Sequence, residues 1–274
     1  MMRVCAIRNC CGSRRFSPPP KTRSRSLRPS SAADFSPRLT ISVIIPSWND
    51  AENLSSLLPA LAGLDRIDEI IVVDASGDSA SERIAHQTGV RFVHCGETSR
   101  GGQMNHGAAL ATGDVFVFQH ADTVLEQGHL AAIESAMKNQ AIAGGAFYRK
   151  FDERHPHLKP LEYFARFLTR RGGTLFGDQT VFVRREIFLN LGGYAKIPLM
   201  EDVEFSARLR AAGKIAVLDP PVRSSSRHHD ENGAWRTTGQ NGLFMLLYKL
   251  GVSPQRLHRW YYRERRDQVR HRSA

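Results

Sequence analysis

From Leu39 onward, short β-branched runs alternate with amphipathic stretches. This alternation is typical of helices packed on a mostly parallel sheet. The expected strands are 40–45, 70–73, 91–94, 115–118, 143–148, 180–183 and 215–218, and the last should end at Pro220-Pro221. The expected helices are one over 54–61, then 81–87, 103–111, one ending near 139, 158–169, 202–212, 234–250 and 254–270. We therefore predict an α/β fold with C-terminal helices.

The positive charge of the chain is concentrated at its two ends. Of the net charge of +11, residues 1–38 contribute nine Lys and Arg against Asp34, and residues 256–274 contribute seven Arg against two acids. The segment 39–255 is left with a net charge of −2. A nucleic-acid groove requires a basic surface on the folded body. We therefore expect no nucleic-acid partner.

Residues 1–38 form a separate segment rich in Arg, Ser and Pro, with almost no periodic apolar content. Such a composition predicts a disordered basic leader. An organelle transit peptide and a start codon assigned too far upstream explain it equally well. Because three of the four cysteines lie there, only Cys95 remains in the body, which indicates a reducing compartment. We expect an α/β domain over 39–225 and a helical extension over 226–274.

No stretch reaches the ~18 consecutive apolar residues of a membrane-spanning helix. The nearest candidate is the six-residue run LFMLLY at 243–248, which precedes an Arg-, Trp- and Tyr-rich end. Buried helices with a solvated Arg face explain this region, and so does weak association with an anionic membrane surface. We expect a cytoplasmic protein, peripheral to a membrane in the second case, or an imported one if the leader is a transit peptide.

Polar side chains follow each of the first four expected strands. Because the carboxyl ends of parallel strands meet at one edge of the sheet, where ligands bind, these side chains should converge. Taken alone, each of them has a structural alternative as a helix cap or turn former. In chain order they are Asn49, Glu52, Asp74, Arg100, Gln103, Asn105, His120 and Asp122.

Five motifs in this order resemble a known family. They are ISVIIPSWNDAENL, IIVVDASGDSA, SRGGQMNHGAALATGD, VFVFQHAD and PLMEDVEFSARLRAAGK, and they span roughly residues 39–220. The chain resembles the inverting nucleotide-sugar glycosyltransferases of family two. The resemblance implies a GT-A fold, with a Rossmann-like, mostly parallel central sheet and helices on both faces. PLMEDVE and SPQRLHRWYYRER are similar to the small stand-alone bacterial-type transferases, some of which are associated with carotenoid glycosylation.

The resemblance implies a nucleotide site on the first three motifs. Pro46, Asn49 and Glu52 would line the base and ribose pocket, and Asp74 would contact the uracil or ribose. Arg100 would lie near the diphosphate, where a guanidinium suits paired phosphate oxygens. Gln103 and Asn105 would position the loop or the nucleotide. A solvated loop charge is the structural alternative for Arg100.

The metal motif of the family departs from its usual form here. His120-Ala121-Asp122 stands where the family has Asp-x-Asp. Asp122 matches the last acidic position, which in the family coordinates a divalent cation that bridges both phosphates. His120 replaces the first acid, which weakens the case for Mg²⁺ and favours Mn²⁺. We expect one cation held mainly by Asp122 and the diphosphate.

The resemblance places the catalytic base at Asp202, with Glu201 orienting the acceptor or a loop. Inverting transfer needs a carboxylate that takes the proton of the attacking hydroxyl. The structural alternative is that both acids favour the positive end of a helix dipole. Acceptor-side residues would be Gly177, Asp178 and Gln179, or these form an ordinary turn. Trp235 and Arg236 would shield the site or stack on a sugar, and a core tryptophan is the alternative.

The leading hypothesis is transfer of a hexose, UDP-linked, to an acceptor hydroxyl or carboxylate with inversion. Within this hypothesis, a lipid or carotenoid acceptor is one alternative. Nucleotidyl transfer is the second enzymatic hypothesis, although PSWNDAEN lacks the glycines of a nucleotidyltransferase loop. The non-enzymatic alternative, motivated by His120, is a nucleotide-sugar-binding protein that has lost its chemistry.

Overall fold

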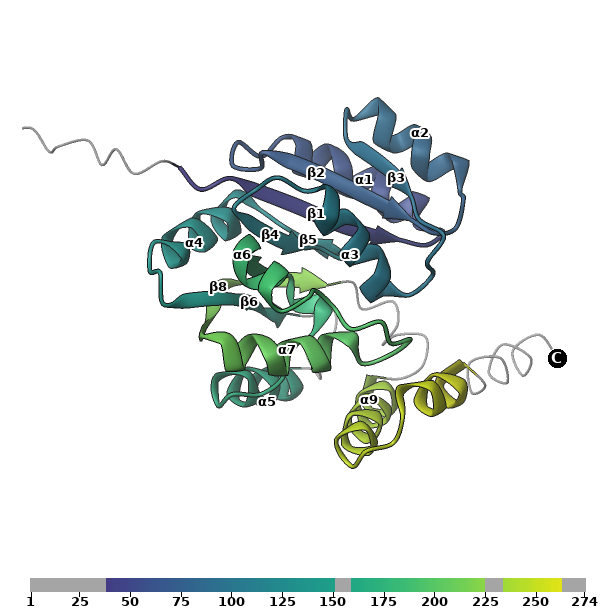
Figure 1. Cartoon of the computed structure of the whole chain (residues 1–274), viewed down its shortest axis with the longest axis vertical. Helices are drawn as coiled ribbons and strands as arrows, with labels where there is room; N and C mark the ends of the chain where they lie inside the picture. The colour runs from purple at the N-terminus through teal and green to yellow at the C-terminus, as the bar shows by residue number, and fades with distance from the viewer. Residues whose placement is uncertain (1–37, 151–158, 225–233, 263–274) are drawn as a thin grey trace, which may run out of the picture. The chain divides into compact units, whose positions relative to one another are not determined.

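The computed structural model describes residues 38–150, 159–224 and 234–262. Eight strands form one sheet with the order β3-β2-β1-β4-β7-β6-β8-β5 (Figure 1). The strands are β1 Ile41–Ser47, β2 Glu69–Asp74, β3 Arg91–His94, β4 Val115–Phe118, β5 Thr123–Val124, β6 Ile142–Lys150, β7 Val181–Arg184 and β8 Lys214–Ser224.

The helices are α1 Ala51–Ala62, α2 Ser79–Gln87, α3 Arg100–Leu110, α4 Gln127–Met137, α5 Lys159–Arg170, the 3₁₀ turn η2 Gly177–Gln179, α6 Arg185–Asn190, α7 Glu201–Ala212 and α9 Ala234–Lys249. Residues 254–262 are also helical, within the helix expected over 254–270. Among the described residues, the structure contains no helix with the length and apolar character needed to cross a bilayer.

The sheet is mostly parallel. β1 pairs in parallel with β2 and β4, β2 with β3, and β6 with β8. The pairs β4–β7, β6–β7 and β5–β8 are antiparallel. β4 lies between β1 and β7 and all four of its residues are buried, as a continuous apolar run predicts. The predicted mostly parallel α/β sheet is therefore confirmed.

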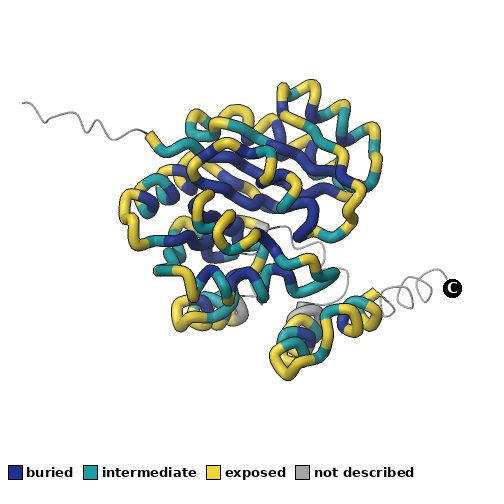
Figure 2. The backbone as a smooth tube through the Cα atoms, viewed as in Figure 1, coloured by how far each residue is buried: buried dark blue, intermediate teal, exposed yellow. Residues whose placement is uncertain are grey.

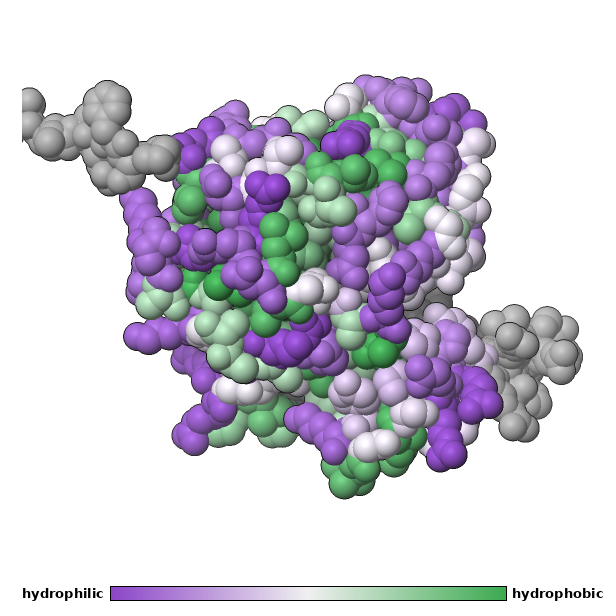
Figure 3. Space-filling view, viewed as in Figure 1, coloured by the Kyte–Doolittle hydropathy of each residue, from purple (hydrophilic) through white to green (hydrophobic). Residues whose placement is uncertain are grey.

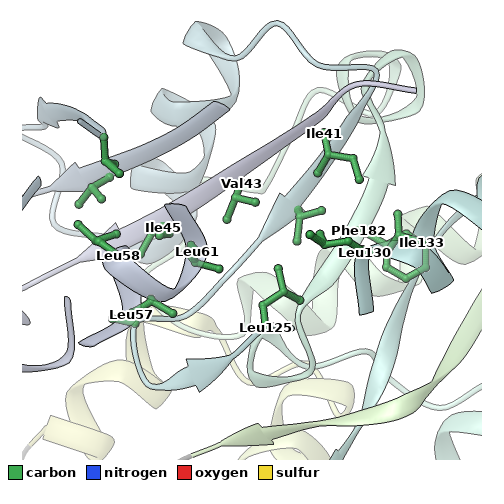
Figure 4. Close-up of a cluster of buried hydrophobic side chains, with 14 of the residues drawn as sticks. Ile41, Val43, Ile45, Leu57, Leu58, Leu61, Leu125, Leu130, Ile133 and Phe182 are labelled. Carbon is green, nitrogen blue, oxygen red and sulfur yellow. The ribbon is translucent and has the colours of Figure 1, made fainter. Parts of the chain in front are cut away.

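Helices cover both faces of the sheet, and each face has its own hydrophobic cluster. Val43 and Ile45 of β1 point to one face, where the leucines of α1 and α4 pack against them (Figure 4). Ile44 points to the other face, which α3, α6 and α7 cover. The expected spacing of Leu54, Leu57, Leu58 and Leu61 on one side of α1 is confirmed, since all four are buried. Each such side chain stabilises the fold by roughly 1.5–3 kcal/mol.

The strand expected over 215–218 is longer than predicted. β8 continues through Asp219, Pro220 and Pro221 to Ser224, so the expected break at the prolines is wrong. The two prolines fall where the register between β6 and β8 shifts, between Phe147 and Arg149 of β6. A proline cannot donate a ladder hydrogen bond, and an irregular stretch is where a strand tolerates that loss.

Three short elements near the site were not expected. They are β5, α6 and η2, each of six residues or fewer. The helix α3 also begins at Arg100 rather than at Gln103, because the Ser99 hydroxyl accepts a hydrogen bond from the Gly102 amide and caps the first turn. This earlier start places Arg100 in the first turn of the helix.

Candidate active site

The loop after β1 forms one wall of the candidate site. Pro46 is buried within β1, opposite Val73 of β2, whereas Asn49 is exposed and Glu52 lies exposed in the first turn of α1. Asn49 has a φ of 54°, in the left-handed region that non-glycine residues rarely adopt. Asp50 fixes this turn, because its carboxylate accepts hydrogen bonds from the Trp48 amide and the Asn53 side chain.

Asp74 is the last residue of β2, and its side chain stabilises the turn that follows. Its side chain is fully buried, and its Oδ2 accepts hydrogen bonds from the amides of Ser76 at 2.9 Å and Gly77 at 2.8 Å. The Ser76 hydroxyl donates to the same carboxylate. The structure therefore gives Asp74 the turn-forming role that was its structural alternative, and its predicted contact with a nucleotide stays a prediction.

The first two turns of α3 carry three of the expected site residues, which are Arg100, Gln103 and Asn105. Arg100 is exposed, and its charge acts on His120, Asp122 and Asp202. Gln103 is buried. Asn105 donates to the Tyr194 carbonyl and accepts from the Tyr194 amide, both at 2.8 Å. Of the two roles predicted for Asn105, the structure thus displays the positioning of a loop.

A buried amide at the end of β4 fixes the turn that carries His120 and Asp122. Gln119 accepts a hydrogen bond from the Thr180 hydroxyl at 3.0 Å and donates to the Thr123 carbonyl at 2.6 Å. It therefore joins the end of β4 to the start of β7 and to β5. The local sequence gave no signal for this role, because Thr180 lies 61 residues away.

His120 is a neutral imidazole in this site. Burial lowers the pKa of His120 to about 3, and the positive charge of Arg100 adds to that effect, although Asp178 opposes it. Its Nε2 is buried without a hydrogen-bond partner. A Cβ added at Gly177 would lie 2.6 Å from that nitrogen, so the ring lies against the backbone of η2.

Asp122 lies in a cluster of acidic side chains. Although the residue is exposed, partial desolvation raises the pKa of its carboxyl, and the charges of Asp178 and Asp50 raise it further. Arg100 lowers the same pKa. Carboxylates that repel one another in this way favour a bound cation.

Of the two residues of the metal motif, only Asp122 suits a divalent cation as a ligand. Such a cation would need further ligands from outside the motif. Among the described residues, no three His, Cys, Asp or Glu side chains come together as a metal site. The Nε2 of His120 faces Gly177. The oxygen chemistry of Asp122 suits Mn²⁺ or Mg²⁺, and most of the remaining ligands would have to come from a bound diphosphate.

Among the carboxyls of the site, that of Asp202 has the pKa shifted furthest from its ordinary value. Burial raises the pKa of Asp202 to about 7, and the neighbouring charge of Glu201 raises it as well. The Gly177 amide donates to Oδ2 at 3.2 Å and the Val203 amide donates to Oδ1 at 2.7 Å, and these bonds, together with Arg100, act in the opposite direction. A carboxyl with a pKa near neutrality can both accept and release a proton.

The segment before α7 also holds a strained residue and a buried phenol. Met200 caps α7 with a φ of 69°. Tyr194 is buried, and burial together with the charges of Asp202 and Glu201 raises its pKa well above the usual value. Asp202 and Tyr194 lie close together in the packed interior, with Leu175, Val181, Phe205, Ser206 and Leu209. Three non-glycine residues near the site have a positive φ and so a strained backbone, and they are Asn49, Thr180 and Met200.

The turn η2 joins the metal motif to the catalytic helix. Gly177 contacts both His120 and Asp202. Asp178 forms an ion pair with Arg149 of β6, and the Gln179 side chain accepts a hydrogen bond from the Phe176 amide. The structure shows Gly177, Asp178 and Gln179 as a turn, which was their structural alternative. Their acceptor contacts stay predictions.

Three residues of the cluster were missed by the sequence reasoning. Asp50, Arg149 and Tyr194 were not among the residues expected in the site. Asp50 lies inside a recognised motif and could have been found there, whereas Arg149 and Tyr194 have no local signal. The side chains of Trp235 and Arg236 lie outside the described residues, so their role stays a prediction.

Comparison with known proteins identifies relatives of this fold. A family model described as glycosyl transferase family 2 matches residues 42–192. The mannosyltransferase PcManGT from Pyrobaculum calidifontis, in complex with GDP-Man and Mn²⁺, superposes with a TM-score of 0.61 at 17% identity, covering 80% of this chain and 67% of that one. No curated protein sequence matches the chain.

Two further solved structures are similar. The TarS 1–349 structure from S. aureus in complex with UDP-GlcNAc has a TM-score of 0.54 at 15% identity, covering 69% of this chain and 59% of that one. Glucosyl-3-phosphoglycerate synthase from Mycobacterium tuberculosis, in complex with Mn²⁺, UDP and glucosyl-3-phosphoglycerate, has a TM-score of 0.52 at 22% identity, covering 78% and 81%. At these identities the likeness concerns the fold.

Proposed function

The chain belongs to glycosyl transferase family 2, and on that premise we propose that it transfers a hexose from a nucleotide sugar to an acceptor with inversion. The single observation that carries the proposal is that the charge of Arg100 acts on the carboxyls of both Asp122 and Asp202. One of these acids suits a metal–diphosphate, and the other suits proton transfer. Displacement at an anomeric carbon needs both functions.

Asp202 acts as the general base. Inverting displacement requires the acceptor oxygen to form its bond to the anomeric carbon as the bond to the diphosphate breaks. The acceptor proton passes to the Asp202 carboxylate, and the leaving diphosphate keeps the bonding electron pair. A pKa of about 7 suits this role, because the base is then ionised in part near neutral pH and still binds a proton well.

Glu201 and the Gly177 amide position the base. Glu201 is buried beside Asp202, and its charge keeps the pKa of that carboxyl high. The Gly177 amide holds Oδ2, which leaves the side chain in one orientation. These residues act through Asp202 and do not touch the reacting atoms.

The donor diphosphate lies between Arg100 and Asp122. The guanidinium would bind phosphate oxygens directly, and Asp122 would hold a divalent cation. When bound, such a cation supplies Lewis-acid stabilisation of the leaving diphosphate. His120 is neutral and therefore adds no charge here, which makes the site less acidic than an Asp-x-Asp motif and favours Mn²⁺ over Mg²⁺.

We further propose UDP as the nucleotide and a hydroxyl or carboxylate as the acceptor group. The exposed loop with Asn49 and the buried turn of Asp74 would form the base and ribose pocket. The complexes of the similar proteins with GDP-Man, UDP-GlcNAc and UDP support a nucleoside-diphosphate donor of either base. Within this proposal the acceptor is lipophilic, and the enzyme acts in the cytoplasm.

Thermal unfolding of the full chain tests the donor class. A ligand that binds the folded state raises the melting temperature according to its occupancy. We expect a shift with UDP and a UDP-hexose that requires Mn²⁺, smaller shifts with GDP, CDP and dTDP, and loss of the Mn²⁺-dependent shift in Asp122→Ala. Asp65→Asn, at an exposed acid outside the site, is the matched control. Stabilisation by nucleoside triphosphates alone would favour nucleotidyl transfer, and no shift with any nucleotide would overturn the proposal.

A further inference from the structure

The helix α5 carries an aromatic face that points away from the protein. Tyr163 is 73% exposed, Phe164 59%, Phe167 52% and Leu168 41%. Residues three or four positions apart are neighbours on the surface of an α-helix, as Tyr163 and Phe167, Phe164 and Phe167, and Phe164 and Leu168 are, so these four side chains form a continuous apolar face. Most of the outer side of α5, below α7 in the view, is exposed (Figure 2). Contiguous exposed apolar surface of this kind marks an interaction site.

The opposite, polar face of α5 packs on the protein. The guanidinium of Arg166 lies 4.1 Å from the centre of the Tyr148 ring and 3.1 Å from the carboxylate of Asp219. The Nε of Arg170 donates to the Tyr148 hydroxyl at 2.6 Å, and Thr169 is buried. A helix of a soluble domain buries its apolar face, and α5 does the reverse. Its orientation is fixed by these polar contacts.

The charge around the aromatic face is basic. Lys159, Arg170 and Arg171 are exposed at its two ends, and Glu162 is the one acid in this helix. The Arg171 guanidinium lies 4.9 Å from the centre of the Phe167 ring. Aromatic side chains bordered by basic ones are typical of helices that lie in the interface of an anionic membrane. Green, hydrophobic residues are visible at this lower margin of the molecule (Figure 3).

Charge argues against a second copy of α5, and against either end of the chain, as the occupant of this face. Two copies of α5 packed against each other would bring together two basic surfaces and repel. Residues 1–37 and 263–274 of the chain are also net basic. An anionic lipid surface, in contrast, complements both the aromatic face and its basic ends.

We propose that the aromatic face of α5, formed by Tyr163, Phe164, Phe167 and Leu168, docks the protein on the surface of an anionic phospholipid bilayer. The rings enter the interfacial region, and Lys159 and Arg171 contact lipid phosphates. This docking does not depend on the transfer reaction. It differs from the membrane association considered for the run at 243–248 and the basic end that follows it, because it uses another helix.

The helix α5 is held to α7, whose first turn carries Asp202. The Arg210 side chain of α7 donates to the Thr169 carbonyl in α5 and, at 2.5 Å, to the Gly173 carbonyl beyond it. The Leu175 amide donates to the Ser206 hydroxyl of α7 at 2.8 Å. These contacts tie α5 to the helix that carries Asp202.

Co-sedimentation with vesicles tests the docking. The full chain is mixed with vesicles of phosphatidylcholine alone or of equal parts phosphatidylcholine and phosphatidylglycerol. We expect binding to the anionic vesicles that weakens with salt, and about tenfold weaker binding of Phe164→Gln/Phe167→Gln, because affinity follows the apolar area inserted. The matched control, Leu189→Gln, replaces a residue of α6 that is exposed to a similar degree, at 54%.

A second double variant distinguishes α9 from α5 as the membrane-binding surface. Leu243→Gln/Leu246→Gln changes exposed leucines of α9 and should leave vesicle binding unchanged. Loss of binding in this variant but not in the α5 variant would overturn the proposal, as would no binding of the unmodified chain. Sedimentation velocity without lipid supplies the third outcome. If the α5 substitutions dissociate a dimer and leave vesicle binding intact, the face is a protein interface. Equal melting temperatures of the variants establish that each is folded.

Discussion

The Gly177 amide donates a hydrogen bond to Oδ2 of Asp202 over 3.2 Å, while the same glycine lies against the ring of His120. One residue without a side chain thus connects the motif at the end of β4 to the base at the start of α7. A substitution at Gly177 should therefore affect both His120 and Asp202.

Gly177→Ala should destabilise the protein. The added Cβ would lie 2.6 Å from Nε2 and 2.8 Å from Cε1 of His120, so the ring must move, and overpacking of this kind costs about 1–3 kcal/mol. In the His120→Ala background the cost should mostly vanish, because the clashing ring is gone. Urea unfolding of the four proteins measures the coupling. Gly96→Ala, where nothing lies within 4 Å, is the control, and equal costs in both backgrounds would show that the ring contact is unimportant.

Asp202→Asn should reduce kcat by roughly 10²–10⁴-fold and leave nucleotide binding intact, because it removes a general base and no donor contact. In the unmodified protein, kcat should rise with pH through about 7, since the carboxyl must be ionised to accept the proton. Steady-state rates between pH 5 and pH 9 measure this. A rate that falls across this range would assign Asp202 another role.

The pH dependence of stability gives an independent check on Asp202. Its pKa is raised from 3.8 to about 7 by folding, so between these values the folded state binds more protons than the unfolded state. The contribution of Asp202 to the free energy of unfolding therefore falls as pH rises from about 4 to about 7. The melting temperature of Asp202→Asn minus that of the unmodified protein should become more positive over this range. A difference that does not change with pH would contradict the raised pKa.

His120→Asp should strengthen metal binding. A second carboxylate beside Asp122 adds an oxygen ligand and negative charge, which Mg²⁺ prefers to imidazole. We expect roughly tenfold lower Mg²⁺ or Mn²⁺ concentrations at half-maximal activity and a larger metal-dependent rise in melting temperature. His120→Asn, which adds no charge, is the matched control. If both variants need as much metal as the unmodified protein, position 120 does not act on the cation.

Local sequence patterns predicted the elements that build the site. The apolar run at 115–118 identified the central strand, and the spacing of Leu54, Leu57, Leu58 and Leu61 identified the buried side of α1. Family motifs then brought the expected site residues to neighbouring strand ends. These features are readable because each depends on residues only a few positions apart.

The remaining features depend on contacts between distant segments. Asn105 binds Tyr194 across 89 residues, and Gln119 binds Thr180 across 61. The course of β8 through Pro220 depends on its pairing with β6, which no local pattern encodes. The outward aromatic face of α5 depends on Arg166 and Asp219 in the same way. Amphipathic spacing predicts which side chains share a face but not which face packs inward.

Release of a nucleoside diphosphate from a nucleotide sugar tests the central proposal most directly. The full chain, Asp122→Ala, Asp202→Asn and the control Asp65→Asn are incubated with UDP-hexoses, GDP-mannose and Mn²⁺, with and without a lipid extract as acceptor source. We predict that the unmodified chain and the control release diphosphate from a UDP-hexose only with Mn²⁺, faster with acceptor, and that the two site variants do not. Equal release by Asp202→Asn, or release of pyrophosphate from UTP in place of UDP from a UDP-hexose, would contradict the proposed transferase.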